Sequence, residues 1–505
     1  MNLSRRKLLK GGLAALALGA FDGLPVFAAP PGWKPPKKPG LVVGILSDTH
    51  LQSGWDGVTP HGGFPLTYVT NAMKYFRDCD IDAFMHLGDA AHRGKNVEIQ
   101  YHREIFDKFF PGGKSPRDGR KVEKLIVCGN HELYGDVVGG GPGAWAANIW
   151  KDKAERDKHT LVGNLEKHWE QTWGEKYEPV WHKEVKGYHF FGIHWREYEK
   201  SEMQLAEFIL AKADEYSLRG TKPFFILSHK RNHFQCSHAL REFPNAIAFC
   251  GHWHMSNADW KTIFFDEFGG FFPTIQVGAC RMDGGCCLDG RERLTKGDIV
   301  EEKDDPNAKK SAWSEAKHPS RQGLVMSVYD DLAVVIERRE FGQGGSLGPK
   351  WVFPIGKFET KPYSRATLTK KIGAPEFAKG ATLAVDVNVG VVTGHVNGKP
   401  RTEPGIKLSI PMADGNPKSR AYSYDVVVVG DGRKLFKSVY FSGANCGVGH
   451  EPDHGVTRLE IPKSELPEGK ELKIAVRPLS SLGTKGKPLV AEYFTAIGKV
   501  KPVKS

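Results

Sequence analysis

A chain of 505 residues is long enough for two or three domains with sizeable buried cores. Its formal net charge of +12 suits anionic substrates or simply solubility, and because the charge is dispersed, no basic run interleaved with aromatics indicates a nucleic-acid track. The eight cysteines include no C-x-x-C pair, which argues against a structural zinc knuckle, and a chain this long can bury real cores and is not a disulfide scaffold. Only Cys280, Cys286 and Cys287 cluster, in a loop where an exported protein could oxidise a pair.

Residues 1–28 have the pattern of an export signal. A basic segment with paired arginines at 4–10 precedes an apolar stretch at 11–21, and a small-residue cleavage site ends at Ala28. The arginine pair resembles a twin-arginine signal, whose export machinery carries folded proteins and so allows metal loading beforehand. An ordinary secretory signal or a retained anchor is the alternative, although the apolar stretch is short for a membrane span. We expect a periplasmic or extracellular protein, with 29–39 as a Pro/Lys-rich linker.

From residue 40 to residue 356, apolar runs alternate with helical patterns, which predicts a layered α/β domain. Helices are expected over 68–77, 95–110 and 201–216. Strands are expected over 41–46, 84–87, 125–127, 188–193, 224–227, 246–249, 262–265, 274–277, 323–329 and 333–337. Two stretches interrupt the domain. The glycine-rich stretch at 135–143 reads as a connecting loop, with a mobile loop over the rim of the site as the alternative, and the charge-rich stretch at 289–319 reads as a solvated excursion.

Residues 357–505 differ in character. Short alternating or β-branched runs, separated by turn signals, predict an all-β sandwich of immunoglobulin or fibronectin type. The expected strands lie at 382–389, 406–410, 423–429, 435–439, 458–461 and 472–476. Cys446 is the only cysteine here, so an internal inter-sheet disulfide is excluded. We expect this region to supply no ligand to a metal site and to make surface glycan or protein contacts, as such modules often do.

Five short polar motifs stand at the ends of apolar runs in the α/β part. In order they are Asp48-Thr49-His50, Gly88-Asp89, Gly129-Asn130-His131-Glu132, His229 and Gly251-His252-Trp253-His254. Oxygen and imidazole donors on rigid supports are what a hard or borderline metal ion needs. Strand ends of an α/β sheet converge on a common crevice. Each motif alone is weak, but the ordered set predicts a site for two metals.

The same ordered set resembles the calcineurin-like metallophosphoesterase family, over about residues 40–340. The resemblance implies a four-layer fold in which a double β-sheet sandwich is flanked by helices. It implies one metal held by Asp48, His50, Asp89 and His254, and a second held by Asp89, Asn130, His229 and His252, with the Asp89 carboxylate bridging. It implies that His131 is no ligand but faces the leaving group or a phosphate oxygen.

One position departs from the family pattern. His92 stands three residues after the bridging Asp89, where the family often has Asp, Asn or Tyr, so its role is open. The absent Tyr and the presence of His50 argue against the purple acid phosphatase branch. Weaker candidates for the rim of the site are Tyr134, Arg231, His233 and His238, whereas Trp253 is expected to pack beneath it.

The predicted chemistry is phosphoester hydrolysis. Two divalent ions about 3.5–4 Å apart would supply an activated hydroxide and clamp the phosphate. The imidazoles favour Mn, Fe, Zn or Ni over Ca, and His131 would act as general acid. We therefore expect an exported phosphoesterase that acts on a phosphomonoester or a phosphodiester. The alternative is a surface binding protein with a vestigial site, and a nuclease has no special support.

Overall fold

The computed structural model describes residues 38–53, 64–136, 150–230, 234–254, 257, 262–264, 271–280, 321–342, 345–347, 350–353, 369–370, 372–396, 399–413, 415–416, 419, 421–440, 456–494 and 499–503. The export signal, most of the linker at 29–39 and the stretch at 289–319 lie outside these residues, so those interpretations stay predictions. No helix in the described ranges is both long and apolar enough to cross a membrane.

The first sheet has six strands, which are β1 (Leu41–Leu46), β2 (Ala83–His86), β3 (Glu123–Ile126), β10 (Gln322–Val328), β11 (Val334–Glu340) and β12 (Trp351–Phe353). Their order across the sheet is β12-β11-β10-β1-β2-β3. Because β1, β2 and β3 are parallel neighbours, the residues that follow them all lie at one edge of the sheet.

The second sheet also has six strands, which are β4 (Val180–Val185), β5 (Tyr188–Ile193), β6 (Phe224–Ser228), β7 (Ala246–Cys250), β8 (Ile263–Phe264) and β9 (Thr274–Gln276). Their order is β4-β5-β6-β7-β9-β8, and β5, β6, β7 and β9 run parallel. The residues after β6 and β7 therefore also meet at a single edge.

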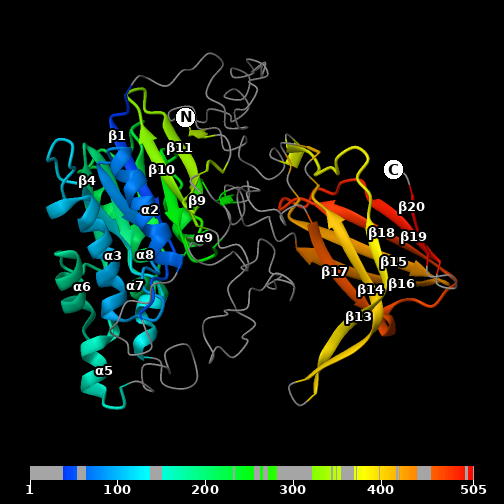
Figure 1. Cartoon of the computed structure of the whole chain (residues 1–505). Coiled ribbons are helices and arrows are strands. Elements are labelled where there is room, and N and C mark those ends of the chain that lie inside the picture. The colour runs from blue at the N-terminus through cyan, green and yellow to red at the C-terminus, as the bar shows by residue number, and fades with distance from the viewer. Residues whose placement is uncertain are drawn as a thin grey trace, which may run out of the picture.

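The described helices of this α/β part are α2 (Phe64–Asp78), α3 (Asn96–Phe109), α5 (Lys153–His159), α6 (Leu165–Trp173), α7 (Trp195–Lys200), α8 (Met203–Lys212) and α9 (Phe234–Ala239). Alternate residues of one strand enter different cores: Met85 joins the core shared by the two sheets, and Phe84 joins the core under α2, α3 and α6. A third core lies between the second sheet, α8 and α9. The predicted metallophosphoesterase-type arrangement of helix, sheet, sheet and helix layers is confirmed (Figure 1).

Residues 372–503, here called the C-terminal β-region, form two further sheets. The strands are β13 (Ala384–Val396), β14 (Lys399–Pro411), β15 (Ser423–Gly430), β16 (Arg433–Tyr440), β17 (Val456–Pro462), β18 (Glu471–Leu479), β19 (Leu489–Phe494) and β20 (Lys499–Val503). The orders are β13-β14-β17 and β16-β15-β18-β19-β20. Side chains of both sheets share one core, for example Leu408 on β14 and Val426 on β15. The all-β character is as predicted, and the immunoglobulin or fibronectin type stays a prediction.

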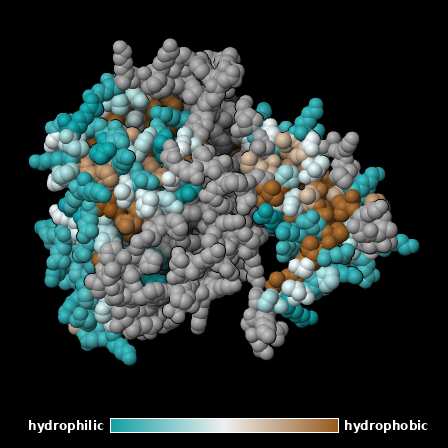
Figure 2. All heavy atoms as spheres, in the orientation of Figure 1, coloured by the Kyte–Doolittle hydropathy of each residue, from teal (hydrophilic) through white to brown (hydrophobic). Residues whose placement is uncertain are grey.

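The large apolar side chains that are most exposed in the described ranges belong to the C-terminal β-region. They are Val392, Val429 and Phe436, with exposed fractions of 45%, 40% and 55%. Figure 2 shows apolar side chains at the surface of this part of the molecule. In the antiparallel register of β15 and β16, Val429 and Phe436 are diagonal neighbours, so they point to the same face of their sheet.

Candidate metal centre

All seven predicted ligands stand in loops that directly follow strands. Asp48 and His50 follow β1, Asp89 follows β2, Asn130 follows β3, His229 follows β6, and His252 and His254 follow β7. Both sheets therefore contribute, and their ligand-bearing edges face each other. Most of these side chains are buried, as are the loops that hold them.

Backbone strain is concentrated at the predicted ligands. Five of them have positive φ angles, namely Asp48 (51°), His50 (46°), Asp89 (55°), His252 (72°) and His254 (51°). For a residue other than glycine, this left-handed region costs on the order of 1–3 kcal/mol, and the strain persists only where the surroundings enforce it. Such strain gathers at functional sites, so its location independently marks this edge of the sheets.

Two motif glycines allow neighbouring loops to approach the acidic ligands closely. A Cβ atom on Gly129 would collide with the carboxylate of Asp89, and one on Gly251 would collide with Asp48 and with the hydroxyl of Ser47. Each glycine therefore removes the side chain that would hold apart two ligand-bearing loops. The glycines of the Gly-Asn-His-Glu and Gly-His-Trp-His motifs thus have a steric function.

The structure brings together the four residues predicted for the first metal, here called the first shell. Its donor atoms all lie within 4.8 Å of one another, on Asp48, His50, Asp89 and His254. The Nε2 atom of His254 lies 3.1 Å from Oδ1 of Asp48 and 3.3 Å from Nε2 of His50. The same atom of His50 lies 3.8 Å from Oδ2 of Asp89. The backbone N–H of His252 donates to Asp48, at 3.0 Å from Oδ2, which orients the carboxylate.

The residues predicted for the second metal, here called the second shell, also lie close together, and they include Asp89 as well. The Oδ1 atom of Asn130 lies 2.9 Å from Nε2 of His229 and 3.0 Å from Nδ1 of His252. The Nε2 atom of His229 lies 3.3 Å from Oδ2 of Asp89, the same oxygen that approaches His50 in the first shell. One carboxylate oxygen is therefore placed between the two groups, where a bridging ligand has to be.

The protonation chemistry of the second shell fits a cation. The Nδ1 atom of His229 lies 2.7 Å from the carbonyl oxygen of Leu87, so this nitrogen carries the hydrogen, and Nε2 of the neutral ring turns a lone pair towards Asn130 and Asp89. Burial lowers the pKa of His229, but the Asp89 carboxylate overrides burial and raises it to about 9. Converging lone pairs therefore require a positive charge between them, either a proton or a metal ion.

The other ring of this shell is available as a ligand. Burial and then the neighbouring His229 lower the pKa of His252 to about 3, so its imidazole stays neutral. Imidazole nitrogens combined with carboxylate and amide oxygens suit divalent transition metals better than calcium. The residues present therefore fit two such ions, one in each shell, with Asp89 common to both.

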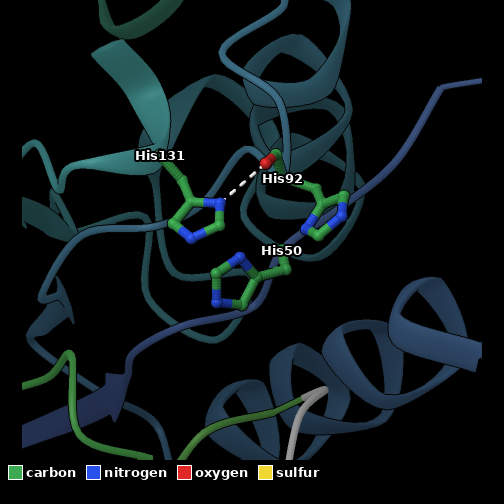
Figure 3. Close-up of side chains that lie close together, drawn as sticks. All are labelled: His50, His92 and His131. Atoms are coloured by element: carbon green, nitrogen blue, oxygen red, sulfur yellow. Dashed lines mark hydrogen bonds between the residues drawn. The ribbon is translucent and has the colours of Figure 1, made fainter. Parts of the chain in front are cut away.

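His131 stands beside both shells without being one of their members. Its Nδ1 atom lies 2.7 Å from the carbonyl oxygen of His92, so Nδ1 carries the hydrogen and Nε2 points away from this bond (Figure 3). That Nε2 atom lies 3.9 Å from Oδ2 of Asp89, and the backbone N–H of His131 donates to Oδ1 at 2.8 Å. The ring is thus fixed in one tautomer, with its second nitrogen aimed at the shared carboxylate.

His92, the position that departs from the family pattern, lies within this cluster. Its ring stacks on that of His131, with centroids 5.6 Å apart, and meets His50 edge-on at 5.5 Å (Figure 3). One nitrogen from each of the three rings falls within 4.8 Å of the others. A neutral imidazole has a single nitrogen lone pair, so a His50 ring that serves the first shell cannot serve a third ion. His92 is therefore read as a rim residue beside His131.

Glu132 has a role that sequence reasoning left unassigned. Its Oε2 atom accepts the backbone N–H groups of Asp89 (2.9 Å) and Gly129 (2.6 Å), and its Oε1 atom accepts that of Ala91 (2.8 Å). Burial and then the charge of Asp89 raise the pKa of Glu132 to about 7. A single carboxylate thus ties the loop of the shared ligand to the loop that carries Asn130. Its place in the Gly-Asn-His-Glu motif was the available signal.

Trp195 was also missed, although it lies two residues after the predicted strand at 188–193. It begins α7, and its ring lies 5.5 Å from that of His229 and 5.2 Å from that of His252. The indole therefore forms an apolar wall of the second shell. Such a wall limits the access of water and holds the imidazole planes in place.

The weaker candidates have mixed outcomes. Arg231, His233 and the side chain of Tyr134 lie outside the described residues, and so do Cys286 and Cys287. His238 is exposed on α9, where its ring contacts Phe271. Cys280 is buried and forms no disulfide within the described part of the chain. The ring of Trp253 lies edge-on to that of His252, with centroids 5.7 Å apart, and also packs against the core of the C-terminal β-region.

Comparison with solved structures gives only distant likenesses. A dimetal phosphatase from Danio rerio is 12% identical (TM-score 0.34), over 62% of this chain and 99% of that one. GAP50, the anchor in the inner membrane complex of Plasmodium, is 10% identical (TM-score 0.34), over 63% and 90%. A purple acid phosphatase from yellow lupin seeds is 14% identical (TM-score 0.35), over 62% and 54%. At these values the likenesses carry no argument about activity, and none of the curated proteins matches the chain.

A family comparison is more direct. Residues 41–256 match the family described as calcineurin-like phosphoesterase. The matched segment begins at β1, ends two residues after His254, and so contains all five motifs and both shells. The match and the two assembled donor sets together support a calcineurin-like phosphoesterase segment with candidate ligands for two metals over residues 41–256.

Proposed function

We propose that this protein is a metal-dependent phosphoesterase that hydrolyses a phosphomonoester or a phosphodiester. One observation carries the proposal: the seven predicted ligands form two adjacent donor groups that share the Asp89 carboxylate. A vestigial site in a surface binding protein should have lost ligands first, and all seven are present. The family match over residues 41–256 supports the same reaction class.

When bound, two divalent ions acidify a water molecule and neutralise the phosphoryl oxygens. Asp89 would hold the two ions, and the neutral Asn130 would contribute an oxygen without adding negative charge near an anionic substrate. His131 has its Nδ1 hydrogen committed to the His92 carbonyl oxygen. Its Nε2 atom therefore has to take up a proton before it can donate one to the leaving-group oxygen.

The test is a metal analysis combined with a substrate panel. Purified mature protein should carry close to two transition-metal ions per chain and should hydrolyse at least one of a monoester, a diester, a nucleotide or a phospholipid head group. Asp89→Asn should lower metal content and activity together. Asp118→Asn is the matched control, because this carboxylate pairs with Arg120 on the surface. Protein that holds no metal and is not activated by Mn, Fe or Zn would refute the proposal.

We also propose that the protein is exported by the twin-arginine machinery and works in the periplasm or outside the cell. The basis is the arginine pair Arg5-Arg6 ahead of the apolar stretch at 11–21. Replacing both arginines with lysine should leave the precursor inside the cell, whereas replacing the nearby Lys10 with arginine should not. Continued export of the double variant would contradict the twin-arginine route.

A further inference from the structure

Trp253 connects the metal centre to a distant part of the chain. It stands between two predicted ligands, His252 and His254, both of which have strained, positive φ angles. Its backbone N–H closes a tight turn onto the carbonyl oxygen of Gly251, at 2.9 Å. Its side chain packs against the buried core of the C-terminal β-region, which holds Leu408 and Val426. One residue thus belongs to the ligand loop by its backbone and to another core by its side chain.

The C-terminal β-region is fastened to the α/β part at a second place. Ile372 and Leu482 are 3% and 7% exposed, and both belong to the core that the two α/β sheets share. Leu482 lies in the turn after β18, which Ser480 and Thr484 close by mutual hydrogen bonds. The buried side chains reach into the α/β part, so the two parts share apolar cores in both directions.

The backbone beside Ile372 is tied firmly to the C-terminal β-region. The side-chain amide of Asn416 donates to the carbonyl oxygens of Ile372 (3.1 Å) and Ala374 (2.9 Å). The hydroxyls of Ser419 and Thr484 both donate to the carbonyl oxygen of Gly373, each at 3.0 Å. The backbone of this segment is hydrogen-bonded to the C-terminal β-region, whereas the side chain of Ile372 is buried in the α/β part. The segment therefore attaches the two parts to each other.

We infer that the C-terminal β-region positions the metal ligands His252 and His254 through Trp253. The inference rests on the proposed function, because it treats these histidines as ligands. His252 and His254 are strained positions on either side of a single residue in one short loop, and such strain persists only where the surroundings enforce it. Two hydrogen bonds from outside hold the start of this loop. The side-chain amide of Gln276 donates to the carbonyl oxygen of Gly251, and the backbone N–H of His252 donates to Asp48. Neither bond involves Trp253, whose indole packs against the core of the C-terminal β-region.

The consequence is that a region without any motif residue contributes to metal affinity. Groups that orient metal ligands typically contribute 10–100-fold in affinity. Trp253 is in this sense a positioning residue. If its indole only filled space, its loss would lower stability and leave the affinity of the folded protein unchanged. If it positions the histidines, loosening the attachment elsewhere should also weaken metal binding.

The experiment uses the full chain and four variants. Metal-depleted protein is titrated with Mn²⁺, and thermal unfolding is followed in parallel. Trp253→Ala should weaken Mn²⁺ binding by about 10–100-fold, and Trp253→Phe should restore most of it by keeping an aromatic anchor. Leu482→Ala should weaken binding several-fold, although Leu482 belongs to the core between the sheets and not to the ligand loop. Phe436→Ala is the control, because its side chain is 55% exposed and should change nothing.

The outcomes separate this inference from the proposed function. Wild-type protein that binds no Mn²⁺ and hydrolyses no ester defeats the proposed function before any variant is compared. Wild-type protein that binds Mn²⁺, while folded Trp253→Ala and Leu482→Ala bind it equally well, overturns the positioning role alone. If Trp253→Ala does not fold, the Trp253→Phe and Leu482→Ala titrations decide the question in the same way.

Discussion

Replacing Glu132 with glutamine should weaken metal binding more than it weakens the fold. The carboxylate accepts three backbone N–H groups on its two oxygens, from Asp89, Gly129 and Ala91. Glutamine keeps one oxygen and places an NH₂ group where the second oxygen stood. At least one of these buried N–H groups then faces another donor. The loops that carry Asp89 and Asn130 therefore lose part of the hydrogen bonding that joins them.

The magnitude follows from the same three bonds. A buried donor left unsatisfied costs about 1–3 kcal/mol, and each of two bonds that changes from charged to neutral loses about 1 kcal/mol, so the sum is about 3–5 kcal/mol. In the metal-free protein, relief of the repulsion between Glu132 and Asp89 offsets part of this cost. Bound cations already cancel that repulsion, so the metal-loaded form bears more of the loss. We therefore expect metal affinity to fall by about 10–100-fold.

The assay is a Mn²⁺ titration of metal-depleted protein, with the melting temperature measured in parallel. Glu98→Gln is the matched control, because the Glu98 carboxylate is equally buried and also accepts backbone N–H groups, from Ser53 (3.2 Å) and Arg93 (2.8 Å). It should lower the melting temperature and change the affinity only a few-fold. Equal losses of affinity in both variants, or none in Glu132→Gln, would refute the reasoning.

Three further predictions concern histidines. His131→Ala should keep its metals, and its steady-state turnover should fall by about 10²–10⁴-fold on esters with poor leaving groups. The loss should be much smaller on nitrophenyl esters, and an equal loss of turnover on both kinds of ester would remove the general-acid role. His92→Ala should also keep two metals per chain by elemental analysis, with less than a 10-fold loss of turnover, because the His131 hydrogen bond uses the His92 backbone; a lost ion would instead assign His92 to a metal shell. Burial lowers the pKa of His102 from 6.5 to about 4, so below pH 6.5 the unfolded chain binds a proton that the folded chain does not. The free energy of unfolding should therefore fall by up to about 3 kcal/mol as the pH drops from 6.5 to 4. In urea unfolding, His102→Leu should lose less of this free energy over the same pH range, and an unchanged pH dependence would contradict the prediction.

Strand positions were predictable for the central strands of the α/β part. The predicted runs at 41–46 and 188–193 coincide with β1 and β5, because central strands between helices and a second sheet read as continuous apolar segments. β4 was not predicted. It is the edge strand of its sheet, and polar residues such as His182 and Lys183 interrupt its apolar pattern. β20, another edge strand, was missed for the same reason.

The candidate ligands could be picked out because residue type and position after a strand are local properties. Their supports were not, because they arise from tertiary contacts. A backbone carbonyl fixes the His131 tautomer, and no sequence pattern reports where the carbonyl of His92 points. The bonds of Glu132 to Asp89 and Ala91 likewise cross between loops more than 40 residues apart. The motifs therefore indicate which atoms could bind a metal, whereas only the fold explains why they stay in place.

The division of the chain into an α/β part and an all-β part has the same limit. Composition separates the two at about residue 357, since alternating β-branched runs replace helical patterns there. Trp253 fills a variable position of the Gly-His-Trp-His motif, so its identity carries no information until its contacts are known. In the structure this residue, together with Ile372 and Leu482, joins cores on both sides of the boundary. A strained ligand loop gains rigidity from such a contact, so the boundary drawn from the sequence pattern does not have to be the boundary of the functional unit.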